Sequence, residues 1–176
     1  MVIREELSED IALIRVVVTE AFRTAPKRPG EVRGRDSGTA EANIVDGLRA
    51  DGALTLSLVA IEDGDELVGH VAFSPVSIDG GDVAWFGMGP VAVWPGRQRG
   101  GVGSKLVRAG LERMQKRGAQ GIVVLGNPSY YGRFGFRAHD GLRYLGPPAS
   151  HFMALSFGSV VPSGIVKYHR GFEAAG

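Results

Sequence analysis

The sequence contains no cysteine, and that absence excludes several kinds of protein. Without a thiol the chain forms no disulfide, holds no metal through thiolate ligands and has no cysteine nucleophile. It also lacks an apolar run of the roughly 20 residues that cross a bilayer. Residues 1–6 contain two acids and no apolar segment of the kind found in signal peptides. We therefore expect a cytoplasmic protein that has no membrane partner.

An excess of either charge is missing as well. The 20 lysines and arginines nearly balance the 19 aspartates and glutamates, and the formal net charge is +1. With so little net charge, the overall charge of the chain does not favour nucleic acid as a partner, and any anion site must come from a local group of residues. The spacing of histidines and acids matches no common metal site, so no metal is expected. At 176 residues the chain is long enough for one domain, 1–176, with a full core.

The pattern of apolar residues indicates alternating helices and strands in a mixed α/β fold. We expect strands over residues 2–7, 53–61, 67–78, 83–93, 120–125, 137–145, 151–157 and 164–168, and helices over 9–23, 39–50 and 102–118. Turn sequences join the second, third and fourth strands, which predicts an antiparallel meander. The strand at 120–125 follows a crossover helix and should therefore lie parallel to 83–93. Residues 26–38 predict a loop, either a solvated connection or a lid beside a substrate pocket.

Residues 87–106 are the most informative stretch of the chain. Val91, Ala92 and Val93 have the pattern of a short buried strand. Three glycines between positions 100 and 103 then precede a run of apolar residues at helical spacing. Glycine lets the backbone approach a ligand closely, and the first N–H groups of a helix attract anions. Since Arg97 and Arg99 lie in the same turn, the stretch predicts a bound phosphate.

Two common phosphate-binding motifs do not fit this stretch. A P-loop places lysine directly after a glycine, whereas here the order is Gly103-Ser104-Lys105. A dinucleotide-binding fingerprint needs a third glycine three residues after Gly103, where the chain has Leu106. It also needs an acidic residue about 20 positions further on, and residues 122–125 are entirely apolar.

The spacing that does fit is Gln98-x-x-Gly101-x-Gly103, entered from a strand and followed by a helix. It resembles the acyl-coenzyme A signature of the GNAT superfamily of N-acetyltransferases, Gln/Arg-x-x-Gly-x-Gly/Ala. A second element, Tyr131-Gly132-Arg133-Phe134-Gly135-Phe136, resembles the late Tyr-x-x-x-Gly-Phe element of that family. With residues 125–128 ahead of it, this element looks most like the predicted acetyltransferases of the YhbS type. The resemblance covers residues 2–145 and implies a mostly antiparallel twisted sheet with a splayed parallel strand pair, flanked by helices.

The resemblance implies acetyl-coenzyme A (acetyl-CoA) as cosubstrate and an amine as acceptor. The pantetheine arm would pair with the strand edge at 91–93, beside a bulge for which Gly87, Gly89 and Pro90 are suitable. The pyrophosphate would lie against the backbone N–H groups of residues 99–104. The donor-binding residues expected on these grounds are Val91, Ala92, Val93, Gln98, Arg99, Gly100, Gly101, Val102, Gly103, Ser104, Asn127 and Tyr131.

Tyr131 is the predicted catalytic residue, acting as a general acid. A phenol with a pKa of about 10 can protonate a leaving thiolate whose conjugate acid has a pKa of about 8.5. A structural alternative is that Tyr131 packs beside Phe134 and Phe136 and bonds its hydroxyl to the backbone. The absence of cysteine agrees with direct transfer in a ternary complex, since no acyl-enzyme can form on a thiol.

The general base is not evident from the sequence. Many members of the resembled family carry a glutamate on the strand before the glycine turn, but residues 83–88 contain no carboxylate. Other candidates for the base are Glu20, His70, His139 and His151, and the aromatic candidates for a wall of the acceptor pocket are Phe22, Trp85 and Phe86.

Two functions are therefore open. The first is an N-acetyltransferase that acts on a primary amine of a small molecule, peptide or protein. The second function is a non-catalytic acyl-CoA-binding sensor or regulatory module, because residues 83–88 lack the carboxylate that could act as general base. The apolar late strands at 151–157 and 164–168 are compatible with a monomer and with a homodimer.

Overall fold

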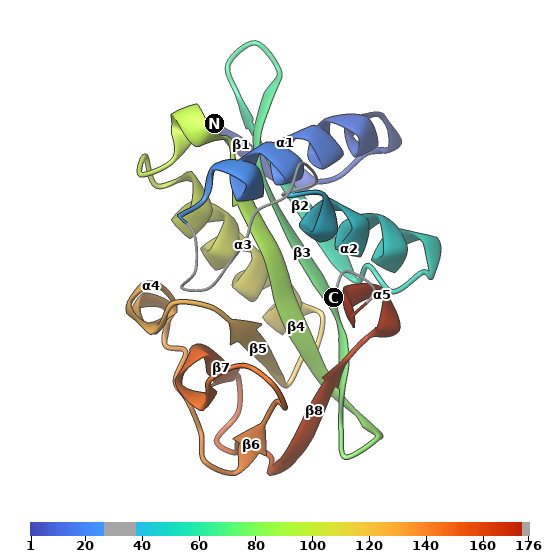
Figure 1. Cartoon of the computed structure of the whole chain (residues 1–176), viewed down its shortest axis with the longest axis vertical. Helices are drawn as coiled ribbons and strands as arrows, with labels where there is room; N and C mark the ends of the chain where they lie inside the picture. Colours follow the sequence, from blue (N-terminus) through green and yellow to red (C-terminus); the bar gives the residue numbers. More distant parts are fainter. Residues whose placement is uncertain (27–37, 174–176) are drawn as a thin grey trace.

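The computed structural model describes residues 1–26 and 38–173, and in it a central sheet lies between two layers of helices (Figure 1). The strands are β1 (Val2–Glu5), β2 (Leu56–Glu62), β3 (Glu66–Ile78), β4 (Gly81–Val93), β5 (Gly121–Leu125), β6 (Leu142–Arg143), β7 (Phe152–Ser156) and β8 (Gly164–Tyr168). The α-helices are α1 (Ile11–Thr24), α2 (Thr39–Ala50), α3 (Val102–Lys116), α4 (Pro128–Tyr131) and α5 (Arg170–Glu173). Short 3-10 helices are η1 (Ser8–Asp10), η2 (Pro95–Arg97), η3 (Gly132–Phe134) and η4 (Ala149–His151).

The sheet is mostly antiparallel, with the order β1-β2-β3-β4-β5-β7 and with β8 pairing the far end of β3. Strands β2, β3 and β4 form the predicted meander. The β4–β5 pair is parallel, as the crossover through α3 predicts. The predicted fold class, a mostly antiparallel sheet with one parallel pair and flanking helices, is therefore confirmed.

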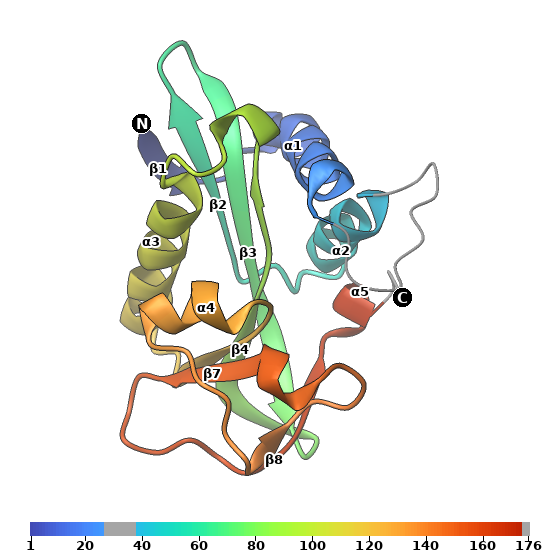
Figure 2. The same cartoon turned by 60° about the vertical axis from the view of Figure 1, so that its left-hand side comes forward.

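The two faces of the sheet are covered by different helices (Figure 2). On one face α3 buries Leu106 and Met114 against Val71 and Phe73 of β3. The ring of Phe73 fits beneath Gly110, where a Cβ atom would lie 2.5 Å from the ring. The periodic apolar face of α3 thus has the partner that its sequence pattern requires.

The opposite face carries α1 and α2. Ile14 and Val18 of α1 pack with Val45 of α2 over Val59 and Ala72 of the sheet. Because successive residues of β3 point to opposite faces, the side chains of Val71 and Ala72 enter different clusters. No helix of the described ranges has the length and hydropathy to cross a membrane.

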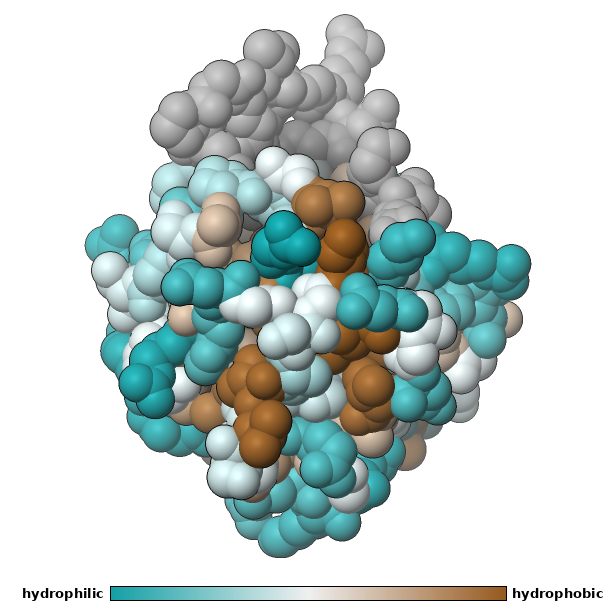
Figure 3. Space-filling view, turned by 90° about the horizontal axis from the view of Figure 1, so that it is seen from below, coloured by the Kyte–Doolittle hydropathy of each residue, from teal (hydrophilic) through white to brown (hydrophobic). Residues whose placement is uncertain are grey.

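The late strands bury their apolar residues within the chain. Phe152, Ala154, Val166 and Tyr168 form a third cluster with Trp85 of β4. The face seen from below is mostly hydrophilic and shows separate hydrophobic patches (Figure 3). The apolar pattern of β7 and β8 is therefore explained by packing inside one chain.

The strand predicted over residues 137–145 is wrong for most of its length. Arg137 makes a single bridge to Ala154, and regular pairing resumes only at Leu142 in β6. Between them the N–H of Leu142 donates to the carbonyl of His139 at 3.1 Å, closing a turn at Asp140-Gly141. An Asp-Gly pair favours such a turn over a continuous strand. Of the loop predicted over residues 26–38, positions 27–37 lie outside the described residues.

Two helix glycines give a matched test of the packing. Gly110→Ala places a methyl group against the buried Phe73 ring and should lower the free energy of unfolding by about 1–3 kcal/mol. Gly47→Ala in α2 would meet only Gly171, at 3.5 Å, and should raise stability by up to about 1 kcal/mol through helix propensity. Urea unfolding of both variants measures the difference. Equal changes in the free energy of unfolding of the two variants would contradict the close approach of Phe73 to Gly110.

Candidate active site

A cavity of about 720 Å³ opens where β4 parts from β5. The parallel ladder runs only from Trp85↔Gly121 to Gly87↔Val123. The residues lining the cavity are Ala21, Phe22, Ala25, Glu41, Ile44, Met88, Gly89, Pro90, Val91, Val93, Gln98, Arg99, Gly101, Gly103, Ser104, Leu125, Gly126, Asn127, Tyr130, Tyr131, Arg133 and Phe172. They come from α1, α2, β4, the turn before α3, the first turn of α3, the end of β5, α4, η3 and α5, and from the residues next to α1 and α4.

A bulge in β4 accompanies this separation. Val71 of β3 pairs with Val91, and Phe73 pairs with Met88, so Gly89 and Pro90 together lie opposite Ala72. The predicted bulge is thus confirmed at Gly89 and Pro90, whereas Gly87 pairs regularly with Ser74. A two-for-one bulge bends its strand and increases its twist, so β4 continues along β3 while β5 stays with β7.

Beyond the bulge, one edge of β4 faces the cavity. The N–H of Trp94 donates to the carbonyl of Val68 at 2.8 Å, so Trp94 and Ala92 direct their main-chain groups toward β3. By the alternation of an antiparallel ladder, Val91 and Val93 direct theirs toward the edge that β5 has left. Of the predicted strand residues, Val91 and Val93 therefore line the cavity, and the buried Ala92 packs against the α1 side.

The turn from β4 to α3 brings the glycine signature to the same cavity. The amide of Gln98 donates to the carbonyl of Val93 at 3.1 Å, which fixes the turn against the strand edge. Arg99 and Gly101 have positive φ angles of 65° and 86°, and Gly101 immediately precedes α3 as a cap without a side chain. The first N–H groups of α3 therefore remain available to an anion.

Not every residue of the signature touches the cavity. Gln98, Arg99, Gly101, Gly103 and Ser104 line it. Gly100 does not, and the Val102 side chain is buried in the core beneath α3.

The second predicted element, α4 with η3, forms the opposite wall. Asn127 caps α4, since its Oδ1 accepts from the N–H of Ser129 at 2.9 Å. The ring of Tyr131 lies over Gly126, where a Cβ atom would stand 2.4 Å from Cε2. Glycine at 126 is therefore what lets Tyr131 reach the cavity.

The Tyr131 ring has aromatic neighbours on two sides, and its predicted packing beside Phe136 is found. Its centroid lies 4.9 Å from that of Tyr130 and 6.0 Å from that of Phe136. Burial, with a smaller effect of Tyr130, raises the pKa of the Tyr131 hydroxyl well above its usual value of about 10. Within the described ranges that hydroxyl makes no hydrogen bond to another residue, so the predicted bond to the backbone is not found. It is held protonated and free to donate.

Sequence reasoning missed the part played by Arg133. Its guanidinium lies 4.4 Å from the centroid of the Tyr130 ring, and its Nη2 donates to Ser104 Oγ at 3.4 Å. It thus connects η3 to the first turn of α3 and is, with Arg99, a second cation in the lining of the cavity. The signal was visible, because Arg133 is the one charged residue inside the Tyr131–Phe136 motif.

Gly103 also has a role that the motif did not indicate. A Cβ atom at this position would lie 2.8 Å from Tyr130 Oη, so the glycine admits a tyrosine from the facing element. The signature therefore serves the packing of α4 on α3 as well as the approach of a ligand.

The other end of the cavity is mainly apolar. Phe22 from α1, Ile44 from α2 and Phe172 from α5 line it together with Glu41. Of the three aromatic residues predicted as walls, only Phe22 lines this cavity. Trp85 packs over Gly121 in the core, where a Cβ atom would lie 2.4 Å from its ring, and Phe86 also packs against the core. Glu41 was not among the predicted site residues.

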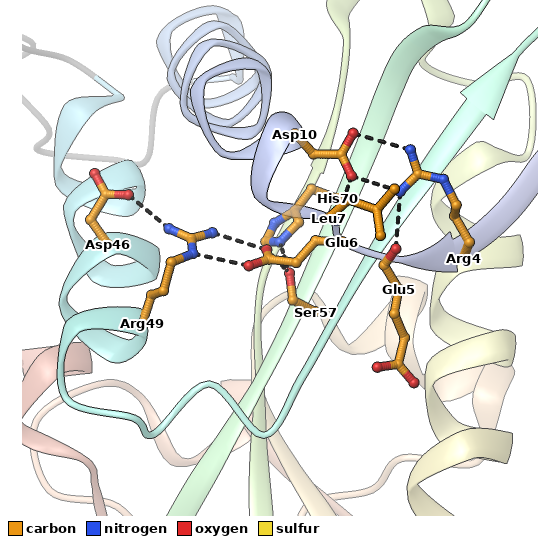
Figure 4. A network of polar contacts seen from close by, with 9 residues as sticks. All are labelled: Arg4, Glu5, Glu6, Leu7, Asp10, Asp46, Arg49, Ser57 and His70. Carbon is orange, nitrogen blue, oxygen red and sulfur yellow. Dashed lines mark hydrogen bonds and ion pairs between the residues drawn. The ribbon is translucent and has the colours of Figure 1, made fainter.

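None of the predicted candidates for the base lines the cavity. Glu20 forms an ion pair with Arg23 at 2.5 Å, and His139 and His151 lie elsewhere. His70 is fully buried, and its Nε2 lies 2.8 Å from Ser57 Oγ (Figure 4). Within residues 1–26 and 38–173, no three side chains of the metal-ligating kinds come together.

The polar network around His70 joins three elements of the fold (Figure 4). Ser57 on β2 also hydrogen-bonds to Glu6, whose carboxylate accepts from Arg49 Nε and Nη2 at 2.9 Å each. Burial would raise the pKa of Glu6, but the hydrogen bonds from Arg49 and Ser57 bring it below its usual value. Burial lowers the pKa of His70 to about 4. The network therefore holds α2 to the sheet, with His70 neutral.

Comparison with known proteins supports the predicted resemblance. Residues 18–138 match the family described as acetyltransferase (GNAT) domain. The chain is 41% identical over 141 residues to the uncharacterized N-acetyltransferase YhbS of Escherichia coli K12, covering 76% of this chain and 84% of YhbS. It is 37% identical over 100 residues to the uncharacterized N-acetyltransferase YjhQ of the same organism, covering 54% of this chain and 55% of YjhQ.

Two solved structures share the fold closely. A GNAT family acetyltransferase from Brucella melitensis, in complex with acetyl-CoA, is 46% identical with a TM-score of 0.81, and 97% of each chain is covered. YhbS from E. coli, in complex with CoA, is 35% identical with a TM-score of 0.85 over 98% of this chain and 91% of that one.

The buried His70 predicts a pH dependence of stability. Between its unfolded pKa of 6.5 and its folded pKa of about 4, the unfolded chain binds a proton that the folded chain excludes. Stability should therefore fall as the pH falls through this range, by about 2 kcal/mol from pH 7 to pH 5. Urea unfolding at the two pH values measures this loss. His70→Gln should remove this loss of stability. The control His151→Gln changes an exposed histidine and should show the same loss as the wild type. An undiminished loss in His70→Gln would contradict the assignment of the pH dependence to His70.

Proposed function

The chain belongs to the GNAT family of N-acetyltransferases, and we propose that it moves the acetyl group of acetyl-CoA directly to a primary amine of a small molecule, peptide or protein. The observation that carries this proposal is the cavity between β4 and β5, which joins the glycine signature to Tyr131. The relatives solved with acetyl-CoA and with CoA support the choice of donor.

The donor would bind along three parts of the cavity. Its pyrophosphate would lie at the start of α3, where N–H groups of the first turn meet the guanidinium groups of Arg99 and Arg133. Its peptide-like pantetheine arm would add to the free edge of β4 through the main-chain groups of Val91 and Val93. Asn127 lies across from this edge, at the start of α4. The thioester would then reach the middle of the cavity, beside Tyr131.

Transfer to an amine requires a balanced set of bond changes. The acceptor ammonium first loses a proton, because only the neutral amine has a lone pair for attack. The nitrogen then bonds to the thioester carbon, the C–S bond breaks, and Tyr131 gives its hydroxyl proton to the leaving sulfur. The nitrogen loses a second proton as the amide forms, which restores the phenol. One proton is released overall, and the products are the acetamide and free CoA.

The environment of Tyr131 suits this acid role. A protonated phenol is needed at the moment when the thiolate leaves, and the raised pKa keeps it protonated throughout the neutral range. Its ring is fixed by Gly126 beneath it and by Tyr130 and Phe136 beside it, so the hydroxyl has a defined position. The same burial makes the phenol a weaker acid than a free tyrosine, so the fixed position of its hydroxyl in the cavity is what supports the role.

Replacing Tyr131 by phenylalanine tests its role. Tyr131→Phe should lower the turnover number at least about 100-fold, because general acid catalysis typically contributes that much. The dissociation constant for acetyl-CoA should change little, since the ring remains. Thiol release measures turnover and calorimetry measures binding. Tyr144→Phe is the control and should keep most activity, because Tyr144 packs beside Phe152 and does not line the cavity. An active Tyr131→Phe would remove the acid role.

Calorimetry with acetyl-CoA tests the donor site itself. Arg99→Glu should weaken binding about 10- to 100-fold, because it replaces a charge-assisted phosphate contact by a repulsion. Arg108→Glu is the control, since Arg108 lies over Phe134 and does not line the cavity. Failure of the unmodified protein to bind acetyl-CoA would overturn the proposal. Binding without transfer to any amine would instead support a non-catalytic acyl-CoA sensor.

A further inference from the structure

The charged residues of the cavity are divided between its two ends. Among the described residues that line it, the charged side chains are Arg99, Arg133 and Glu41. The two arginines belong to the turn before α3 and to η3, on one side of β4. Glu41 belongs to α2, which lies on the other side with α1 and α5 (Figure 2). Among the described residues, the end away from the proposed phosphate contacts therefore has one carboxylate, that of Glu41.

The packing of α2 on α1 places Glu41 in this position. Gly38, directly before α2, lies so close to α1 that a Cβ atom there would be 2.2 Å from the carbonyl oxygen of Thr19. The first turn of α2 is thereby held beside the last turns of α1, which contribute Phe22 to the cavity. Ile44 follows Glu41 by three residues, so both side chains lie on one face of the helix.

Glu41 differs from the acids near it. Asp46 of the same helix accepts from Arg49 Nη1 at 3.0 Å, and Glu20 of α1 pairs with Arg23. The Glu41 carboxylate makes no hydrogen bond or ion pair with another residue of the described parts of the chain. Glu41 is half-buried, with Phe22, Ile44 and Phe172 lining the same cavity. A carboxylate in such surroundings binds a cation more strongly than one in water does.

We infer that Glu41 binds the ammonium group of the acceptor, and that the acceptor is a monoamine on an apolar body, with no carboxylate beside the amine. The inference rests on the proposed function. An alkylamine, with a pKa of about 10.4, arrives as a cation, which the Glu41 carboxylate attracts. Its apolar part would contact Phe22, Ile44 and Phe172. A carboxylate next to the amine, as in a free amino acid, would be repelled by Glu41.

Binding measurements on the CoA-saturated protein test the inference without relying on turnover. Phenethylamine is the probe, and phenylalanine, which adds a carboxylate next to the amine, is its matched comparison. The wild-type protein should bind phenethylamine about 10-fold or more tightly than phenylalanine. Glu41→Gln should weaken phenethylamine binding about 10-fold and reduce that preference. The dissociation constant for CoA should stay the same, because Glu41 lies away from the proposed phosphate contacts.

Two controls separate a local effect from a general one. Glu112→Gln removes an exposed carboxylate of α3 that pairs with Lys116 and does not line the cavity. It should change neither the affinity for phenethylamine nor the affinity for CoA. Glu41→Asp keeps the charge and should retain most of the preference for phenethylamine over phenylalanine. The thermal unfolding midpoint of each variant shows that it is folded.

The binding results test the role of Glu41 and the class of acceptor separately. Equal phenethylamine affinity in wild type and Glu41→Gln would overturn the role of Glu41, and absence of phenethylamine binding to wild type would overturn the acceptor class. Thiol release with phenethylamine is measured separately. If acetyl-CoA binds but no amine is acetylated, the proposed transferase activity fails, while the affinities still decide whether Glu41 binds the amine.

Discussion

Main-chain pairing between β4 and β5 ends at Gly87↔Val123, and the separation of these parallel strands is the constraint on which the site depends. The bulge at Gly89 and Pro90 turns β4 away while its other edge stays bonded to β3. The backbone groups of Val91 and the N–H of Val93 then face a cavity instead of a neighbouring strand, while the carbonyl of Val93 accepts from Gln98. Polar groups at such an edge need a partner, and a ligand with peptide-like amides can supply it. A local irregularity of one strand thus becomes a binding surface.

Two glycines determine which aromatic side chains reach this cavity. Gly126 makes room for the ring of Tyr131, and Gly103 makes room for the hydroxyl of Tyr130. Gly103 lies in the first turn of α3 and Gly126 lies between β5 and α4, and each tyrosine packs where the neighbouring residue has no side chain. Arg133 then stacks on Tyr130 and bonds to Ser104, which joins the two walls. The result is a cavity with its cations at one end, Tyr131 in the wall and a carboxylate at the other end.

The helices, the meander and the parallel pair could be predicted because they depend on local patterns. The apolar period of α3, the turns around the meander and the crossover rule each act over a short range. The strand expected over residues 137–145 was wrong because a turn at Asp140-Gly141 interrupts it. The end of the cavity at the glycine turn could be predicted for a related reason, since Gln98, Arg99, Gly101 and Gly103 are neighbours in the chain. Ala92 and Val102, though within the same stretch, point into the core.

The family, the β2-β3-β4 meander, the parallel β4–β5 pair and the position of the glycine turn could be predicted because their residues are adjacent or regularly spaced. Tertiary packing determines instead which side chains meet at the end of the cavity that contains Glu41. Phe22, Glu41 and Phe172 come from separate helices, and no spacing in the sequence relates them. They come together because α1, α2 and α5 pack on the same face of the sheet, beside the strand that the bulge has bent. Long-range packing of this kind is what a local pattern does not contain.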